Sequence, residues 1–403
     1  MGRKGTFSFF SLCTIYVITW CLYGVHWYDV FPNSTIDTVS GLLLGVTLLI
    51  SLWCLGHVYK WKKPKLFIYI NLLLVAFTIY GFFYLLFGET YYVNGEPVSK
   101  ASYIISCYRS FLSIYAFYYF TKKGYINEDS IKIYILIIAV SYLLYDFLYS
   151  QRIINNSIYG KDFTNNLGYI FLFLMPAAMF FKKTLIRLGL LFVALICVLI
   201  SMKRGAILIG VLLLIWILYG EFKTSSKKTR VWLTILAIVA VGYGASYFIK
   251  YYEEDDFAQA RIEQTLSGDS SGRDEIYGSL IHYYLNDYNI FQQLFGNGPD
   301  ASLGINGRDA HNDWLDLLCC QGLFGVVLYL MYWGVLYKTW RRMRKDKLLF
   351  YAVGSVFIIQ LIRSAISMSY ATLPTCGALL LGYSLALYYQ NKQQVTINKI
   401  SSK

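Results

Sequence analysis

The sequence predicts an all-α protein that crosses a membrane many times. Of its 403 residues, 57% are hydrophobic and 15% are charged, whereas soluble domains carry about 25% charged residues. The apolar residues form long blocks, and a helix needs about 20 mostly apolar residues to span a bilayer. The short alternating strands of a membrane β-barrel are not seen. We therefore expect about twelve transmembrane helices.

Nine of these expected spans lie within residues 1–250. They are residues 8–25, 38–58, 65–88, 102–120, 131–149, 165–181, 185–202, 205–220 and 231–250. A loop at 251–310 separates them from three further spans at 311–337, 348–369 and 371–390, and residues 391–403 form a tail. The connections within 165–202 and 348–390 are short, so a total of about ten or eleven spans is the alternative.

The net charge of +13 indicates membrane orientation rather than a nucleic-acid partner. If the N-terminus is cytoplasmic, lysine and arginine gather at the cytoplasmic ends of the spans, most densely in KTWRRMRKDK at 338–347. This asymmetry is the positive-inside rule, and it predicts that both termini are cytoplasmic. The eight cysteines show no metal-binding spacing and are expected to be small buried side chains.

The loop at 251–310 is expected to be extracytoplasmic and partly helical. It holds eleven acidic and three basic residues, so its net charge is −8, the opposite of the cytoplasmic loops. Ser271 and Asp274 have the spacing of a helix N-terminus ahead of apolar positions at near-helical intervals. FGNGPD at 295–300 predicts a turn, because glycine frees the backbone. A loop of this length is commonly functional.

The helix after this loop is expected to begin with Asp309 as its N-cap, which puts His311 and Asn312 in the first turn. One face of that helix would then carry His311, Leu315, Leu318, Gly322 and Gly325. The two glycines would allow a neighbouring helix to approach closely.

Several ionisable side chains are expected in the outer halves of the spans, where charges are costly and commonly functional. They are Arg109, Asp146, Lys203, Arg204 and Arg363. Most are cations at one depth, which suits an anionic lipid head group in the outer leaflet. The alternative for each is a structural ion pair or a side chain that reaches to the interface.

Arg273 is expected in the first turn of the loop helix, where free backbone N–H groups already favour an anion. An arginine there would bind a phosphate through two parallel hydrogen bonds. The alternative is a salt bridge to Asp274 or to the acidic run at 253–256.

His311 could act as a general base near neutral pH, with an interfacial or capping histidine as the alternative. The pair Asp313-x-x-Asp316 and the run EEDD at 253–256 are expected to form solvated acidic faces rather than a metal site. The sequence therefore predicts neither a metal ion nor a cofactor.

Four motifs follow one another in the second half of the chain: KRGAIL (203–208), SGRDEIY (271–277), LFGNGPD (294–300) and HNDWLDLLCCQGLFGVVLYL (311–330). On these motifs the sequence resembles the O-antigen polymerase/ligase superfamily, which includes the Wzy-type polymerases and the lipopolysaccharide O-antigen ligases. The resemblance covers residues 200–335, and the expected topology extends it over most of the remaining chain.

The resemblance implies a GT-C-like glycosyltransferase in the bacterial inner membrane. Such an enzyme uses undecaprenyl-diphosphate-linked glycans on the periplasmic side, inverts the anomeric centre and needs no metal. By position, His311 matches the proposed base, and Arg204 and Arg273 match the arginines proposed to hold the diphosphate.

Further substrate-binding positions are expected around these three residues. Tyr277 stands where such sequences often have an aromatic residue, whereas Lys203 departs from a commoner small residue. Arg109, Arg363 and Asn312 complete the expected set.

The leading hypothesis is a polymerase that joins repeat units of a surface polysaccharide, an O-antigen or a capsule, with a second lipid-linked oligosaccharide as acceptor. The alternative is a ligase that moves finished glycan onto lipid A-core or another final acceptor. A transporter of the same lipid-linked sugar is a third hypothesis, but it would place charges at mid-membrane rather than on one side. A polymerase would work beside a flippase and a chain-length regulator.

Overall fold

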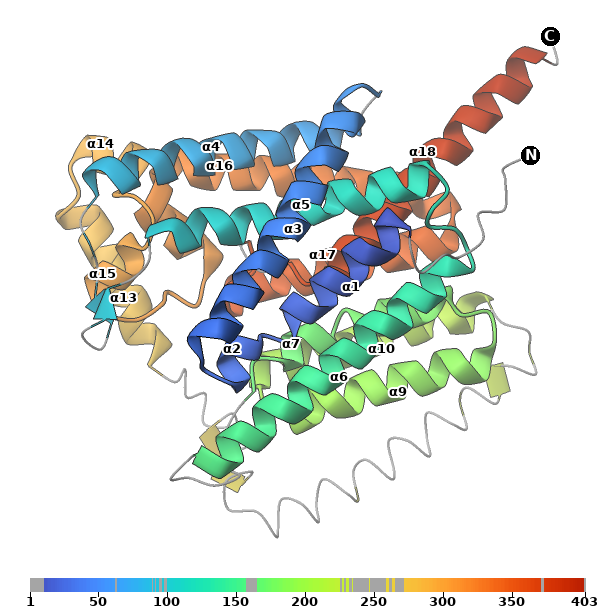
Figure 1. Ribbon diagram of the computed structural model, residues 1–403, viewed down its shortest axis with the longest axis horizontal. Coiled ribbons are helices and arrows are strands. Elements are labelled where there is room, and N and C mark those ends of the chain that lie inside the picture. Colours follow the sequence, from blue (N-terminus) through green and yellow to red (C-terminus); the bar gives the residue numbers. More distant parts are fainter. Residues whose placement is uncertain are drawn as a thin grey trace.

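The computed structural model describes residues 11–61, 64–88, 100–156, 165–224, 272–370 and 373–401, with isolated positions and short stretches between them. Most of the ninth predicted span (231–250), the acidic run 253–256 and the predicted cap Ser271 lie outside the described residues. The described part is helical apart from one short antiparallel pair, β1 (Tyr92–Val93) and β2 (Glu96–Pro97) (Figure 1).

The helices follow the apolar blocks of the sequence. The first six are α1 (Leu12–Gly24), α2 (Trp27–Val30), α3 (Ser34–Tyr59), α4 (Lys65–Phe87), α5 (Lys100–Lys122) and α6 (Ser130–Asn156). The middle of the chain forms α7 (Gly168–Phe171), α8 (Leu174–Ala177), the 3-10 turn η1 (Ala178–Phe180), α9 (Thr184–Ile200) and α10 (Arg204–Thr224). The last part forms α13 (Arg273–Asn286), α14 (Ile290–Phe295), α15 (Ala301–Asn306), α16 (Asp313–Arg342), the turn η2 (Met343–Lys345), α17 (Lys347–Ile366) and α18 (Thr375–Ser401).

The sixth predicted span, 165–181, is helical but interrupted. Pro176 has no backbone N–H and cannot donate to the carbonyl of Leu172, four residues earlier. Some hydrogen bonds there join each N–H to the carbonyl three residues earlier instead, as in a 3-10 helix. One example runs from the Phe173 N–H to the Ile170 carbonyl at 3.2 Å. One long apolar block therefore yields short segments rather than a single helix.

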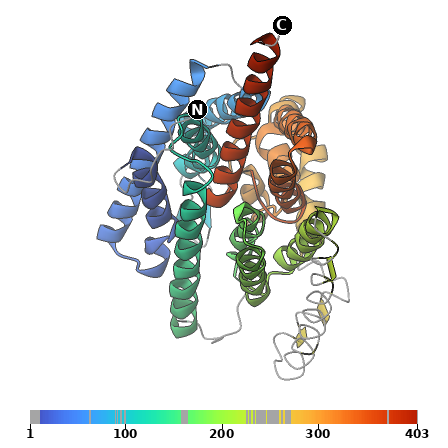
Figure 2. The ribbon, with the colours of Figure 1, turned by 90° about the vertical axis from the view of Figure 1, so that its right-hand side faces the viewer.

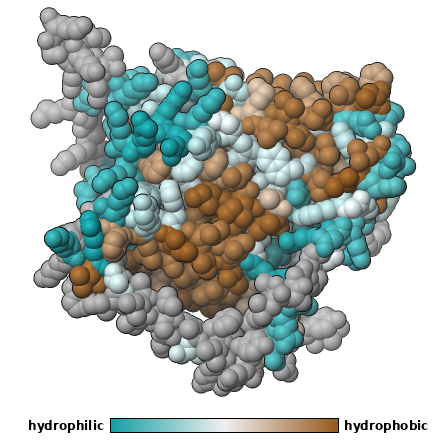
Figure 3. Space-filling view, turned by 180° about the vertical axis from the view of Figure 1, so that it is seen from behind, coloured by the Kyte–Doolittle hydropathy of each residue, from teal (hydrophilic) through white to brown (hydrophobic). Residues whose placement is uncertain are grey.

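Six of the described helices are long and apolar enough to cross a membrane: α3, α4, α6, α10, α16 and α17. Three shorter apolar helices occupy Leu12–Gly24, Gly168–Phe180 and Ile186–Ile200. Helices α5 and α18 are long too, but α5 is rich in tyrosine, which lowers its hydropathy. Figure 3 shows broad hydrophobic surface areas between more hydrophilic edges. The all-α membrane class is confirmed, while the expected twelve spans remain a prediction.

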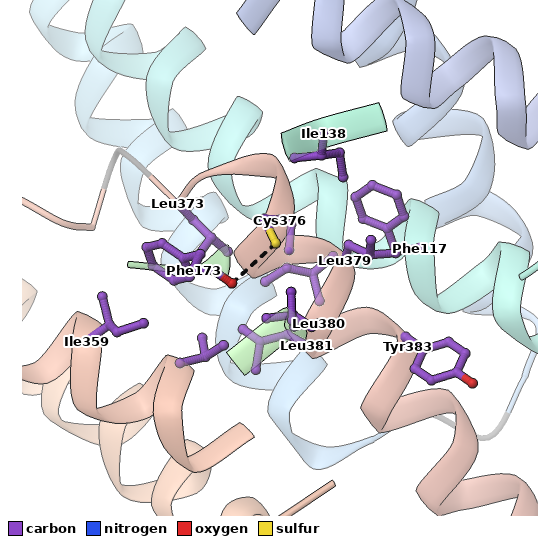
Figure 4. Packing of buried hydrophobic residues seen from close by; sticks show 14 of the residues in the cluster. Phe117, Ile138, Phe173, Ile359, Leu373, Cys376, Leu379, Leu380, Leu381 and Tyr383 are labelled. Atoms are coloured by element: carbon purple, nitrogen blue, oxygen red, sulfur yellow. Dashed lines mark hydrogen bonds between the residues drawn. The ribbon is translucent and has the colours of Figure 1, made fainter. Parts of the chain in front are cut away.

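Helices α5 and α18 form the centre of the bundle. Every side chain in 110–121 of α5 and in 375–386 of α18 is buried, as expected for helices surrounded by protein. Seen end-on, these two helices have α1 and α3 on one side and α16 and α17 on the other (Figure 2). Close by, Cys376 donates through Sγ to the Phe173 carbonyl at 3.3 Å (Figure 4). The eight cysteines are free thiols, and most are buried.

The short helices α13, α14 and α15 pack together at one end of the bundle, and the far end of α18 lies at the opposite end (Figure 1). Helix α16 continues from this group into the bundle, between α4 and α17 (Figure 1). The loop after the ninth predicted span is thus partly helical, as expected, and it covers the end of the bundle where α16 begins.

Candidate active site

The approach to α16 differs from the sequence prediction. The helix begins at Asp313, and its N-cap is Asn312, whose side chain accepts hydrogen bonds from the Trp314 and Leu315 N–H groups at 2.9 and 3.1 Å. Asp309 is therefore not the cap. His311 precedes the helix with φ of 51°, a left-handed conformation that non-glycine residues rarely adopt. The predicted face that joined His311 to Leu315 and the glycines is wrong for this reason.

The backbone around His311 is held from two directions. Tyr277 of α13 donates through its hydroxyl to the His311 carbonyl at 3.3 Å. The Asn312 amide donates to the carbonyl of Ala365, near the end of α17, at 3.0 Å. A left-handed residue needs such support, because the conformation is costly by itself. His311 reaches the protein surface although the surrounding atoms bury part of its side chain, so it remains open to a ligand.

Charges from two other segments surround His311. Burial lowers the pKa of His311, while Asp309 raises it and the positive charges of Arg273 and Lys203 lower it again. The net result is that the pKa of His311 lies below the ordinary value for histidine. A histidine with a lowered pKa is neutral at pH 7, which is the form that accepts a proton.

This shift predicts the pH dependence of the reaction. Because His311 must be neutral to act as a base, the rate should hold below the ordinary histidine pKa of about 6.5 and fall only at lower pH. Asp309→Asn removes a charge that raises this pKa, so the acid limb of a kcat profile should move to lower pH. A move to higher pH would contradict the assignment.

Arg273 is the first residue of α13, and its helix is capped by Gly272 with φ of 75°. The Nε atom of Arg273 is buried and has no hydrogen-bond partner, and the guanidinium forms no ion pair with any described carboxylate. The alternative salt bridge to Asp274 is therefore not formed, and the run 253–256 lies outside the described residues. A half-buried guanidinium of this kind has its donors available for an anion.

Arg363 and Tyr169 lie beside this position. The Arg363 Cζ atom is 5.0 Å from the centre of the Tyr169 ring, in cation–π geometry. Tyr169 is also within electrostatic range of Arg273 and Tyr277. The last turn of α17, the start of α7 and the start of α13 thus meet at one place.

Lys203 and Arg204 directly precede Gly205, which packs in the same region. A Cβ atom on Gly205 would lie 2.3 Å from the Tyr169 hydroxyl and 2.8 Å from the Ile366 side chain, so the start of α10 packs directly on α7 and α17. Lys203 is close enough to affect the pKa of His311. The KRGAIL turn is therefore placed beside the histidine.

Gly205→Ala is expected to lower the transfer rate, because the added methyl group would displace Tyr169 from beneath Arg363. Misplacement of a site by about 1 Å can cost up to about 10²-fold in rate. Gly189→Ala is the matched control, since a Cβ atom there meets nothing within 4 Å. Equal rates for the two variants, at equal membrane levels, would contradict the packing explanation.

The sequence predicts a solvated acidic face at the two aspartates that begin α16. This prediction is wrong, because both side chains are buried. Asp313 accepts hydrogen bonds from the Ser369 N–H (2.7 Å), the Ser369 hydroxyl (2.5 Å), the Tyr370 N–H (3.2 Å) and the Tyr329 hydroxyl (2.8 Å). Asp316 accepts from the Ser302 and Tyr370 hydroxyls. These bonds tie the segment after α17 to α16 and to α15.

These carboxylates are positioning groups that the sequence reasoning missed. Asp313 lies within electrostatic range of Arg363, and it anchors the chain just beyond that arginine. Among the described residues, no group of three or more His, Cys, Asp and Glu side chains could hold a metal ion. Asp313 and Asp316 are instead linked through Tyr370, which donates its N–H to Asp313 and its hydroxyl to Asp316.

Asp313→Asn should lower stability as well as activity. The new amide group would face the donors of Ser369, Tyr370 and Tyr329, and hydrogen bonds to a charged group are worth about 1.5–3 kcal/mol each. We expect a lower midpoint of thermal unfolding in detergent. Asp287→Asn, at an exposed carboxylate, should leave the midpoint unchanged, and an unchanged midpoint for Asp313→Asn would refute the anchoring role.

None of the contacts that Arg109 makes places it beside His311. It donates to the Tyr23 hydroxyl at 2.8 Å and stacks over that ring, and it lies within electrostatic range of His26. Asp146 likewise accepts a hydrogen bond from the Asn165 amide at 2.7 Å. The structure therefore gathers His311, Arg273, Arg363 and the KRGAIL turn, whereas Arg109 contacts Tyr23 of α1 instead.

The fold and this cluster define a multi-pass membrane protein with a histidine and several cations at the mouth of its helix bundle. Residues 189–330 match the family model described as O-antigen ligase. The resemblance predicted from the motifs, to the O-antigen polymerase/ligase superfamily, is thereby confirmed over this part of the chain. The match includes Lys203, Arg204, Arg273 and His311 but not Tyr169 or Arg363, and it points to a glycosyltransferase-like membrane enzyme. No curated protein matches the chain.

Proposed function

We propose that the protein is a polysaccharide polymerase of the bacterial inner membrane. It transfers a glycan from an undecaprenyl diphosphate donor to a sugar hydroxyl of a second lipid-linked repeat unit. The observation that carries the proposal is that Arg273 lies within electrostatic range of His311 and that its buried Nε atom has no hydrogen-bond partner among the described residues. A base and an available cation are the two groups that this reaction needs.

The reaction begins at the acceptor hydroxyl. Its oxygen attacks the anomeric carbon of the donor, and its proton passes to the neutral imidazole of His311. A new carbon–oxygen bond forms as the bond between the anomeric carbon and the diphosphate oxygen breaks. Attack from the face opposite the leaving group inverts the anomeric centre.

The leaving undecaprenyl diphosphate takes the electron pair, so negative charge grows on it. Fixed cations stabilise that charge without having to reorganise during the reaction. Arg273 is the best placed of them, with Arg204, Lys203 and Arg363 around it. Tyr277 and Asn312 hold the backbone on which His311 sits, so we assign them a positioning role. Arg109 is better suited to a more distant part of a substrate.

The proposed topology completes this picture. We place about twelve spans in a GT-C-like arrangement, with residues 1–250 and 311–390 in the membrane and 251–310 on the periplasmic side. Both termini are cytoplasmic, and residues 391–403 form a cytoplasmic tail. A flippase would supply the donor on the periplasmic side, and a chain-length regulator would act beside the enzyme.

A ligase is the second candidate, and the description of the matching family favours it. In a ligase the acceptor would be lipid A-core or another final acceptor, and the donor chemistry would be the same. Product analysis in a strain lacking this gene separates the two. Single repeat units on the final acceptor mean a polymerase, whereas complete polymer left on the lipid carrier means a ligase. Polymer of normal length on its normal acceptor would refute both.

A further inference from the structure

A groove of about 690 Å³ lies between α4 and the loop that follows α14, and this size is typical of a ligand site. Its walls are mainly aromatic: Tyr80, Phe83, Tyr84 and Phe87 come from α4, Phe295 from α14 and Phe324 from α16. The groove is separate from the cluster around His311 and takes no part in the chemistry described above.

The floor of the groove is held in place by direct backbone contact. A Cβ atom on Gly296 would lie 2.3 Å from the Cys320 carbonyl carbon, and one on Gly322 would lie 2.5 Å from the Leu294 carbonyl carbon. Gly322 also interrupts α16 with φ of 63° and ψ of −163°. The freed carbonyls of Cys319 and Cys320 accept from the Asn297 and Gly298 N–H groups, both at 3.0 Å. The groove is therefore a built feature rather than a gap between loose segments.

Among the residues that the structure describes, none of those lining the groove has a charged side chain. It offers aromatic surface, with the amides of Gln292 and Asn297 at one end, and these two amides bond to each other at 3.2 Å. A diphosphate would find no cation here to compensate for its desolvation. The chemistry instead fits a long apolar chain that ends in a polar, uncharged part.

Exposed apolar side chains of a candidate membrane span lie along the groove. Helix α4 is one of the candidate membrane spans, and Phe83 and Phe87 on its groove side are 58% and 78% exposed. Phe291 of α14, beside the groove, is 72% exposed. Apolar side chains exposed on such helices contact the bilayer, so a hydrocarbon chain could enter sideways from the membrane.

The groove and Arg363 lie on opposite sides of α16. The groove is on the α4 side, while Arg363 is on α17 (Figure 1). From the polar end of the groove, Gly298 leads to Asp300, which is within electrostatic range of Asp309. Asp309 is in turn within range of His311. His311 therefore stands between two sites of different chemistry.

We infer that the groove binds the polyprenyl chain of the lipid that carries the acceptor glycan, an inference that rests on the proposed polymerase function. The donor diphosphate is held on the α17 side of α16, and the acceptor lipid enters on the α4 side. Its glycan then passes over α16 toward His311. Two separate lipid sites allow both substrates to be present in one enzyme without competing for one set of arginines.

Photocrosslinking tests this directly on the full chain. Benzoylphenylalanine replaces Phe83, which lines the groove, or its neighbour Phe82, which does not and is equally exposed at 58%. Each protein is placed in phosphatidylethanolamine–phosphatidylglycerol nanodiscs that contain undecaprenyl phosphate. We expect the ratio of polyprenyl to phospholipid adducts to be about tenfold higher at position 83, or about 1.4 kcal/mol of preference. Equal ratios at the two positions would overturn the inference.

A second pair of variants tests the role in the reaction. Ile79→Trp fills the groove from a position that is 52% exposed, and Val75→Trp adds the same bulk one turn away, at a residue outside the groove that is 55% exposed. Ile79→Trp should raise KM for the acceptor but not for the donor, and Val75→Trp should change neither. Matching kinetics for the two variants would overturn the assignment to the acceptor.

Failure of the inference and failure of the proposed function can be told apart, because crosslinking requires no transfer. Equal adduct ratios in an enzyme that still makes polymer would overturn the groove assignment alone. Normal polymer in a strain lacking this gene would overturn the proposed function, and the acceptor assignment with it, even if position 83 captured the polyprenyl probe.

Discussion

His311→Ala is expected to leave single, unpolymerised repeat units on the final acceptor. Loss of a positioned general base typically costs about 10²–10⁴ in rate, and no other described histidine lies in this cluster. The measurement is the length distribution of the polysaccharide in a deletion strain that carries the variant, with the membrane level of the protein checked by immunoblot.

His282→Ala is the matched control for this experiment. His282 lies on α13 of the same loop, and its side chain is exposed and contacts Asn286. Its replacement should leave the length distribution unchanged. Long polymer from the His311 variant, at a normal protein level, would refute the assignment of the base.

Arg273→Ala should lower kcat by about 10²–10³-fold, the usual loss when one donor to a developing negative charge is removed. Arg273→Lys should recover only part of this loss, because a lysine keeps the charge but cannot make two parallel hydrogen bonds. The loss should fall mainly on kcat, since the charge on the diphosphate grows as its bond to the sugar breaks.

The control is Arg308→Ala, at an exposed arginine of the same loop. It removes the same charge from the surface but should leave kcat near that of the parent enzyme. If the two alanine variants lost activity equally, the loss would be explained by a general attraction of the loop for anionic lipid, and the specific role of Arg273 would be refuted.

The helices could be predicted because a bilayer imposes a length and a composition on each span. Every predicted block whose residues are described coincides with helical structure. The sites of interruption were harder to foresee. The block 165–181 reads as continuous by hydropathy, and only Pro176 marked the break. At α16, Asp309 and Asn312 are both good capping residues, and the choice between them depends on the contact from Asn312 to Ala365.

The candidate site could be predicted in part. Order and spacing of the motifs pointed to Lys203, Arg204, Arg273 and His311, because each motif has a local sequence signature. The buried carboxylates have no such signature. Asp313 accepts its hydrogen bond from Ser369, 56 residues away, and no local sequence pattern encodes such a pairing. The direction of the Arg109 side chain could not be predicted either. It depends on the packing of α5 against Tyr23, which is distant in the sequence.

The pairing of Asp313 with Ser369 has a consequence for biogenesis. Segments emerge from the ribosome in order, so α16 is made before Ser369 and Tyr370, which supply most of the hydrogen bonds to its two carboxylates. A carboxylate without partners is costly at membrane depth. We therefore expect the start of α16 to remain at the membrane surface until α17 and the following segment have been translated. The last three long helices would then be integrated together, with the translocation machinery holding α16 in the meantime.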